Sequence, residues 1–356
     1  MVSSDIVRRA DAAQYEREPI PEEQRGQIRV RLLNALPDPY GSVAALCAQY
    51  TGKVVRDLRE VSDDERRTVI DDMLSTVLNG PLEVAQFHWQ IEGVTRAITH
   101  QMVRSRASFF AQESLRFAVP EGNWSQEIPL PPSLAGAPEE RRKYWEPGGK
   151  SLAGAPESAR LLMLDEWEDV MVFLQQKYER LINLGMPAEE ARGILPHDMP
   201  TRIHWVCDLR TLLTEAGKRT CTQAQFPWRL IFAGMAKALR DRAKQADNDE
   251  INSDGWTWPS DGWQFADIAN RLRPVCFQTG SCGFMAKFDR SCNIRSRVDA
   301  FAKFGVPSSK WGEDYLTGRN GYYSDILPWA AREGGAEVIP AINDAEWAAN
   351  PGAARS

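Results

Sequence analysis

The sequence lacks the features that mark several large classes of protein. No apolar run approaches the roughly 20 residues that a membrane-spanning helix needs, and the N-terminal stretch MVSSDIVRRADAAQYERE has no signal-peptide core. Six cysteines among 356 residues are too sparse for a disulfide scaffold. Basic charge is not in excess, because the net charge is -6, whereas general nucleic-acid binders are usually basic. We therefore expect a cytoplasmic protein with neither a membrane nor a nucleic-acid partner.

The sequence does have the composition of a soluble globular protein, with 43% hydrophobic and 26% charged residues. A chain of this length forms one large domain or two ordinary ones. Composition divides it into a polar, helical N-terminal extension at 1–75, a central region at 76–245 that holds the recognisable chemistry, and a loop-rich C-terminal extension at 246–356 of unassigned role. The expected core contacts of the N-terminal extension are Leu32, Leu33, Val43, Leu46 and Val54.

The central region combines extended segments with helices. PLEVAQFHWQIEG has the β-branched and aromatic content of a strand that closes at Gly93. VTRAITHQMVRSR follows with helical spacing of its apolar residues. Further helices are predicted at about 157–184, 201–216 and after Pro227, with a loop at 120–156.

Arginines and hydrogen-bonding side chains cluster in one short part of the central region. Gln101 and Arg104 are three residues apart, so they share a face of the predicted helix. Gln112, Ser114 and Arg116 alternate, so an extended backbone points all three the same way. Guanidinium groups suit phosphate because they form paired, charge-assisted hydrogen bonds. The pattern predicts an anion-binding site, with a solvated basic surface as the alternative.

The stretch IEGVTRAITHQMVRSRASFFAQESLRF resembles the signature of the flavin-dependent thymidylate synthases, in which Arg-His-Arg is followed by Asn-Glu and then by Ser-x-Arg-Tyr. A second block resembles the family in the same order, and AQFPW stands where the family has Ala-Gln-Trp. The resemblance spans roughly residues 78–235. The second block consists of Arg192 before Leu195-Pro196, the triplet Asp208-Leu209-Arg210, and Arg219 eleven residues after Asp208.

The resemblance implies a mixed α+β fold, a small antiparallel sheet with long helices, and a homotetramer whose active sites combine residues of several subunits. It implies FAD and 5,10-methylenetetrahydrofolate as cofactors and a pyrimidine nucleotide as substrate. The implied nucleotide-binding residues are Gln101, Arg104, Gln112, Ser114, Arg116, Arg192 and Arg219. The implied flavin-binding residues are Gly80, Arg104, Ser105, Arg106, Asp208, Arg210 and Thr214.

The implied reaction is one-carbon transfer from folate to C5 of dUMP, which gives dTMP. C5 of a pyrimidine is a poor nucleophile, and one solution is attack of a cysteine thiolate at C6. None of the six cysteines lies in the core of the motifs, and Cys207 is expected to be a buried helix residue. The family instead relies on reduced flavin and on electrostatic activation. By this resemblance Ser114, Arg116 and Arg192 hold the phosphate, and Arg219 is the catalytic residue that favours ionisation at N3.

Departures from the family pattern gather at the flavin positions. One interpretation is that these positions have drifted in sequence while the protein still binds FAD. Another is that the changed flavin pocket supports a different reaction. Methylation needs a reduction step, with NADPH as reductant, whereas hydroxymethylation needs only water to trap the one-carbon adduct. The alternatives are therefore hydroxymethylation of dUMP or dCMP for phage DNA base modification, in a host cytoplasm, and a nucleotide-binding paralogue without turnover. The departures are Gly80 for Thr, Ser105 for His, Asp208 and Thr214 for Asn, and Gln112 for Glu at the nucleotide site.

Two further predictions concern Asp208 and metal ions. A carboxylate at Asp208 either accepts a hydrogen bond from the exocyclic amine of cytosine or contacts only flavin. His100 is expected to be structural or to lie at an interface, and His197 and His204 lack metal-ligand spacing. The spacings of Cys276, Cys282 and Cys292 are unlike those of zinc knuckles. No metal site is predicted.

Overall fold

Four antiparallel strands, in the order β1-β2-β4-β3, form the sheet around which the described chain is arranged. The computed structural model describes residues 28–120, 122–131, 157–221, 224–248, 262–275 and 278. The strands are β1 (Arg29–Ala35), β2 (Gln86–Thr95), β3 (Ser108–Gln112) and β4 (Pro200–Asp208). The α-helices are α2 (Pro39–Tyr50), α3 (Asp63–Ser75), α4 (Arg96–Met102), α6 (Glu157–Asn183), α7 (Ala188–Ala191), α8 (Leu209–Arg219), α9 (Phe226–Asn248) and α10 (Gly262–Arg271). The 3-10 helices are η2 (Leu58–Glu60), η3 (Gly80–Val84), η4 (Trp124–Glu127) and η6 (Arg192–Ile194).

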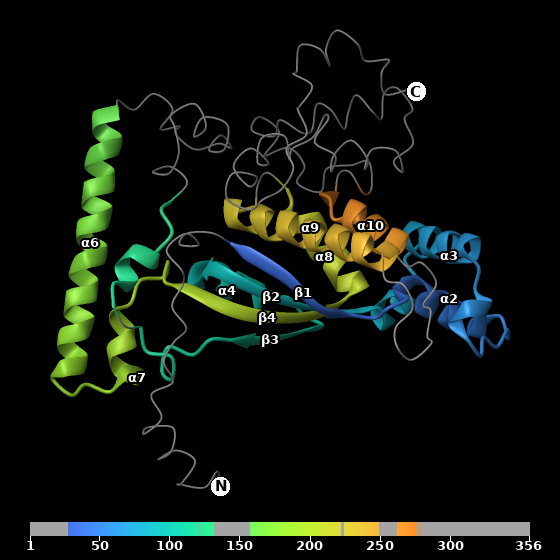
Figure 1. Cartoon of the computed structure of the whole chain (residues 1–356), viewed down its shortest axis with the longest axis horizontal. Helices are drawn as coiled ribbons and strands as arrows, with labels where there is room; N and C mark the ends of the chain where they lie inside the picture. Colours follow the sequence, from blue (N-terminus) through green and yellow to red (C-terminus); the bar gives the residue numbers. More distant parts are fainter. Residues whose placement is uncertain are drawn as a thin grey trace, which may run out of the picture.

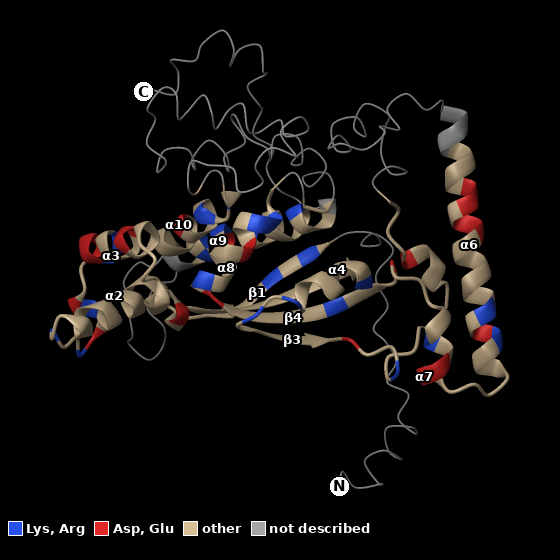
Figure 2. Cartoon of the chain, turned by 180° about the vertical axis from the view of Figure 1, so that it is seen from behind, with Lys and Arg blue, Asp and Glu red and all other residues tan. Residues whose placement is uncertain are grey.

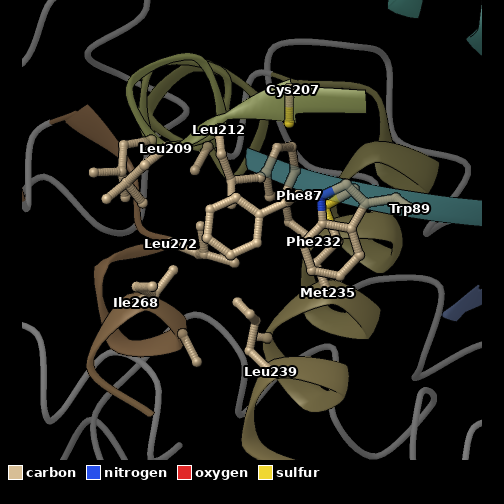
Figure 3. Packing of buried hydrophobic residues seen from close by; sticks show 14 of the residues in the cluster. Phe87, Trp89, Cys207, Leu209, Leu212, Phe232, Met235, Leu239, Ile268 and Leu272 are labelled. Carbon is tan, nitrogen blue, oxygen red and sulfur yellow. The ribbon is translucent and has the colours of Figure 1, made fainter. Parts of the chain in front are cut away.

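The main core lies between the sheet and the helices on one of its faces. Alternate residues of β2, among them Phe87 and Trp89, are buried, and Cys207 of β4 joins them. Helices α8, α9 and α10 lie together on one side of the sheet (Figure 1). Figure 3 shows Phe87 and Trp89 packed with Phe232 and Met235 of α9. Each fully buried side chain of this size contributes roughly 1.5–3 kcal/mol to folding through the hydrophobic effect.

Two glycines adapt the sheet to its neighbours. Gly93 has a φ of 72° and lies where the register of β2 against β4 shifts between Glu92 and Val94. Glycine adopts this conformation without strain, so the position forms a bulge. The strand therefore continues to Thr95 instead of closing at Gly93 as predicted. Gly234 lets α9 lie close to β1, since a Cβ there would meet Val30 Cγ2 at 2.8 Å.

A buried ion pair ties α10 to α2 and α3. Asp38 accepts from Arg66 at 2.6 Å, and their side chains are 0% and 2% exposed. Asp38 Oδ1 also accepts from the Gly41 N–H and from Gln264 Nε2, at 2.7 and 2.8 Å. Gln264 Oε1 in turn accepts from the Tyr40 N–H at 2.9 Å. Each buried charge is thus paired and hydrogen-bonded, which is the condition under which such a pair is stable.

A tyrosine makes a second link between α2 and α10. The Tyr40 hydroxyl donates to Asp267 Oδ2 at 2.7 Å, and Arg271 Nε donates to the same oxygen at 2.7 Å. Burial raises the pKa of Tyr40, and the Asp267 carboxylate raises it further. The hydroxyl therefore stays protonated and remains a donor.

Two segments that the sequence analysis assigned to helices are strands. Residues 29–35 form β1, which pairs with β2, so the N-terminal extension is not helical there. Residues 200–208 form β4, so the predicted helix over 201–216 is wrong in its first half. Burial alternates along this segment, with Ile203, Trp205 and Cys207 buried, which is the period of a strand, and the helix begins only at Leu209.

One core crosses the predicted segment boundaries. Val43 of α2, Ile70 of α3 and Ile268 of α10 belong to the cluster that covers the sheet. The described parts of all three segments therefore pack together, while the division at 75 and 245 stays a prediction about domains. Among the expected core contacts, Val43 is buried and Leu32 packs on the core, whereas Leu33, Leu46 and Val54 are 46%, 40% and 53% exposed and were wrong.

Other elements agree with the sequence. Helix α6 occupies the predicted range, and Gly185, with a φ of 90°, follows its end. Pro187 precedes the short helix α7, and α9 covers the segment after Pro227. Most of the predicted loop at 120–156 lies outside the described residues. Within the described residues, no helix has both the length and the apolar composition needed to cross a membrane.

Gly41→Ala tests the buried ion pair. A Cβ at Gly41 would lie 2.1 Å from Asp38 Oδ2, and this carboxylate cannot move without leaving Arg66 uncompensated. Alanine in a helix normally stabilises by up to about 1 kcal/mol relative to glycine. We expect instead that the free energy of unfolding in urea falls by about 3 kcal/mol or more. Gly193→Ala, which meets no atom within 4 Å, is the control. Equal stability of the two variants would contradict this account.

Candidate active site

One end of the sheet gathers the residues predicted to bind flavin. Ser108, the first residue of β3, pairs with Cys207, so the turn at 104–106 lies beside the junction between β4 and α8. On the other side of β4, Asp208 pairs with the first residue of β2, and η3 with Gly80 comes immediately before this strand. Three separate segments therefore meet at the β4–α8 junction.

Asp208 caps helix α8. Its Oδ1 accepts from the Thr211 N–H at 2.7 Å and its Oδ2 accepts from Thr211 Oγ1 at 3.1 Å, with Asp208 only 5% exposed. Asp and Asn are equally good N-cap residues, so Asp208 preserves the local structure that an Asn would give. Both carboxylate oxygens face the first turn of the helix, which does not favour a role in reading cytosine.

The exposed side of α8 carries Arg210 and Thr214, one turn apart, while Leu212 and Leu213 face the core. Arg210 pairs with Glu83 of η3, the 3-10 helix that starts at Gly80. Both side chains are about half exposed, so this ion pair contributes only about 0–1 kcal/mol. A phosphate group can replace Glu83 at little cost, so the residues fit an anionic cofactor such as FAD.

The turn between α4 and β3 is strained. Ala107 has a φ of 57°, and within the described residues no other non-glycine residue has a positive φ. This conformation costs roughly 1 kcal/mol for an alanine, and such strain gathers at binding sites. The turn exposes Arg104 and Arg106, with Ser105 half-buried between them. Two guanidinium groups are therefore available to a ligand at the same end of the sheet.

A second cluster surrounds Arg219, the predicted catalytic residue. Arg219 Nη1 donates to Gln101 Oε1 at 3.3 Å, and Arg219 Nε donates to Glu215 Oε2 at 3.3 Å. The guanidinium carbon lies 4.5 Å from the ring centroid of Trp228. Trp228 Nε1 donates to Gln101 Oε1 at 2.9 Å. The predicted nucleotide residues Gln101 and Arg219 are thus in direct contact.

A third cluster joins Arg116 and Arg192 through Glu189 of α7. Arg116 Nη1 approaches Glu189 Oε2 at 3.5 Å, and Arg192 Nε donates to the Glu189 carbonyl at 3.1 Å. Ser114 Oγ accepts from the Arg116 N–H at 3.3 Å. The three residues predicted to hold phosphate therefore lie together, and the exposed Glu189 carboxylate neutralises Arg116.

Gln112 stands apart from both nucleotide clusters. Its Nε2 donates to Thr99 Oγ1 at 2.9 Å and approaches Thr201 Oγ1 at 3.4 Å. Within the described residues, no hydrogen bond or ion pair links the Arg219 cluster directly to the Arg116 cluster. Among the described residues, the predicted nucleotide residues thus form separate hydrogen-bonded groups.

Several neighbours of the site were not predicted. Glu215 is four residues before Arg219 on α8, a helical spacing that could have identified it. Trp228 lies in the matched segment AQFPW but was given no role, and neither its contact with Arg219 nor that of Glu189 with Arg116 follows from sequence spacing, because both depend on tertiary packing. Figure 2 shows basic residues on β1, α8 and α9, and both acidic and basic residues on α3.

Histidines form two pairs between segments of the chain that are distant in sequence, so their spacing does not reveal these pairs. His88 Nε2 and His204 Nδ1 are 2.8 Å apart on β2 and β4. The rings of His100 and His197 have centroids 5.6 Å apart, which agrees with a structural His100. Among the described side chains, no group of three or more His, Cys, Asp or Glu residues is arranged to hold a metal ion.

Cys207 cannot readily serve as a nucleophile. It is 1% exposed, and burial raises its pKa well above the usual value, so the thiolate is disfavoured. It lies in strand β4 and not, as predicted, in a helix, although the prediction that it is buried is confirmed. Cys276, Cys282 and Cys292 lie outside the described residues.

Comparison with known proteins identifies the family. A family model described as "Thymidylate synthase complementing protein" matches residues 31–243. The chain belongs to this family. The flavin-dependent thymidylate synthase of Geobacter sulfurreducens is 29% identical over 217 residues, which cover 60% of this chain and 82% of the relative. That of Pyrococcus furiosus is 28% identical over 258 residues, which cover 72% and 89%.

A solved structure is also similar, though remotely. The UMP/dUMP methylase PolB from Streptomyces cacaoi, bound with 5-Br dUMP, is 18% identical with a TM-score of 0.47, covering 62% of this chain and 91% of that one. A score this low adds no argument to the family assignment. The resemblance to the flavin-dependent thymidylate synthases is nevertheless confirmed by the family match, and so is the α+β fold with its small antiparallel sheet.

Asp208→Asn and Asp208→Ala separate the capping role of Asp208 from the effect of its negative charge. An asparagine keeps the acceptor for the Thr211 N–H, so its free energy of unfolding should stay within about 0.5 kcal/mol of the parent value. An alanine removes the cap and should cost about 1–2 kcal/mol. Urea denaturation measures both. Equal losses for both variants would show that the charge, and not the cap, stabilises this helix.

Proposed function

We propose that this protein transfers a one-carbon unit from 5,10-methylenetetrahydrofolate to C5 of dUMP, in an FAD-dependent reaction that yields dTMP. Family membership supports the reaction class, because curated relatives are flavin-dependent thymidylate synthases. The observation in this chain that carries the proposal is the contact between Gln101 and Arg219, two of the positions that the resemblance assigns to the nucleotide.

Arg219 is the proposed catalytic residue. A guanidinium against the pyrimidine stabilises the negative charge that develops on ionisation at N3, and this charge increases the electron density at C5. Glu215 and Gln101 hold this guanidinium through hydrogen bonds, so little reorganisation is needed when the base binds. Such fixed charge replaces the nucleophilic thiol that buried Cys207 does not provide.

The phosphate of the nucleotide is assigned to Ser114, Arg116 and Arg192. Two guanidinium groups and a hydroxyl make paired, charge-assisted hydrogen bonds to a phosphate. The Glu189 carboxylate pairs with Arg116, and this exposed pair is weak enough for a phosphate to displace it. Arg104 and Gln112 are assigned to the nucleotide as well.

The flavin is assigned to the end of the sheet where α8 begins. Arg104, Ser105 and Arg106 would hold it from the strained turn, and Arg210 and Thr214 from the exposed side of α8. Gly80 and Asp208 would lie at the same junction. When bound, the flavin supplies the hydride that methylation needs, and NADPH is the proposed external reductant.

A homotetramer is the proposed assembly, with each active site drawn from more than one copy. Within the described residues the Arg219 and Arg116 clusters share no hydrogen bond or ion pair, which agrees with this arrangement. Helix α6 stands apart from the sheet (Figure 1) and exposes Leu162 and Phe173, which are 65% and 54% exposed. Exposed apolar side chains gathered on one helix are typical of an interface.

A product assay decides between methylation and the two alternatives. The purified protein is incubated with FAD, methylenetetrahydrofolate and either dUMP or dCMP, with and without NADPH. The masses of the nucleotide products are then measured by mass spectrometry. We expect one methyl on dUMP, and only with NADPH. A hydroxymethyl product without NADPH would assign the altered chemistry, and the nucleotide accepted would name the base. Nucleotide binding without any product would favour a non-catalytic paralogue.

A further inference from the structure

Trp228 occupies the space between the core and the proposed base-facing arginine. The residue is 1% exposed, and its indole stacks on Phe232 of the next turn of α9, with ring centroids 6.3 Å apart and an interplanar angle of 26°. Its other ring contact is the Arg219 guanidinium, whose carbon lies 4.5 Å from the ring centroid. A rigid core residue therefore supports a partly exposed cation.

The indole N–H determines the orientation of the Gln101 amide. Gln101 Oε1 accepts from Trp228 Nε1 at 2.9 Å and from Arg219 Nη1 at 3.3 Å, while Gln101 Nε2 donates to Gln225 Oε1 at 2.8 Å. A flipped amide would set its NH2 group against two other donors and lose both bonds. The N–H of Trp228 thus keeps the acceptor end of Gln101 toward Arg219.

The Arg219 guanidinium is held in three directions. Gln101 fixes one terminal nitrogen, Glu215 fixes Nε, and the guanidinium carbon lies over the indole ring. A guanidinium donates only within its plane, so the plane must face the acceptor correctly if the group is to bind one edge of a base. Loss of any one of the three contacts would let this plane rotate.

We infer that Trp228 is a positioning residue for the reaction, acting on Arg219 through its ring face and through the Gln101 amide. This inference rests on the proposed function, because Arg219 is the group that would lie against the pyrimidine. Trp228 lies two residues beyond the AQF that stands in place of the family's Ala-Gln-Trp, and neither motif block assigned it a role.

The test is a graded series at Trp228, assayed for turnover with dUMP. Trp228→Phe keeps a ring face and removes the N–H, so kcat should fall about 3- to 10-fold. Trp228→Leu removes both contacts, so kcat should fall about 10- to 100-fold. The KM for dUMP should change less than about 3-fold, because the phosphate cluster is untouched. Combining Trp228→Phe with Gln101→Ala should lower kcat by much less than the product of the two single effects.

Trp89→Phe is the matched control, because Trp89 is equally buried but lies in the core on β2. Its kcat should stay within about 2-fold of the parent value. The inference is overturned if Trp228→Phe lowers kcat no more than this control does. It is also overturned if the double variant lowers kcat by the full product of the two single effects. Trp228→Phe and the double variant decide the matter even if Trp228→Leu does not fold. Absence of product from the parent protein would instead overturn the proposed function, and the inference with it.

Discussion

The antiparallel pairing of β2 with β4 is the interaction on which the rest of the structure depends. Its register places Asp208 beside the start of β2, and β3 then pairs with the other edge of β4. These two pairings bring η3, the turn at 104–106 and the start of α8 to one junction. The same strands bury Phe87, Trp89 and Cys207 under α9. The pairing that builds the core therefore also positions the segments of the candidate site.

Local signals in the sequence predicted much of this arrangement. The motif blocks around Arg104 and Arg219 pointed to the family, and the spacing of apolar residues predicted the range of helix α6. Residues 200–208 were misread because Asp208 begins a true helix, and the helical pattern was extended backward across a strand. Strand β1 was missed because it is stable only against β2, a contact distant in sequence. Trp228, Glu189 and the His88–His204 pair depend on such contacts as well.

The departures from the family pattern differ in their effect on the local structure. Asp208 keeps the helix cap that an asparagine would provide, so this change leaves the local structure intact. Gln112 replaces a carboxylate by an amide that bonds Thr99 and Thr201, which suits a half-buried position without a charged partner. The arginines of the two proposed nucleotide clusters all match the family pattern, and this match supports the proposed substrate class.

In the proposed assembly the Arg219 cluster of one copy and the Arg116 cluster of another form one active site, and subunit mixing tests this arrangement most directly. Arg219→Ala protein and a variant carrying both Arg116→Ala and Arg192→Ala are each expected to be nearly inactive at low dUMP. If sites form between copies, unfolding and refolding an equal mixture should restore about a quarter of the parent activity, because about a quarter of the sites then draw both intact clusters. A mixture no more active than its separate components would contradict this arrangement, since each chain would then build its site alone.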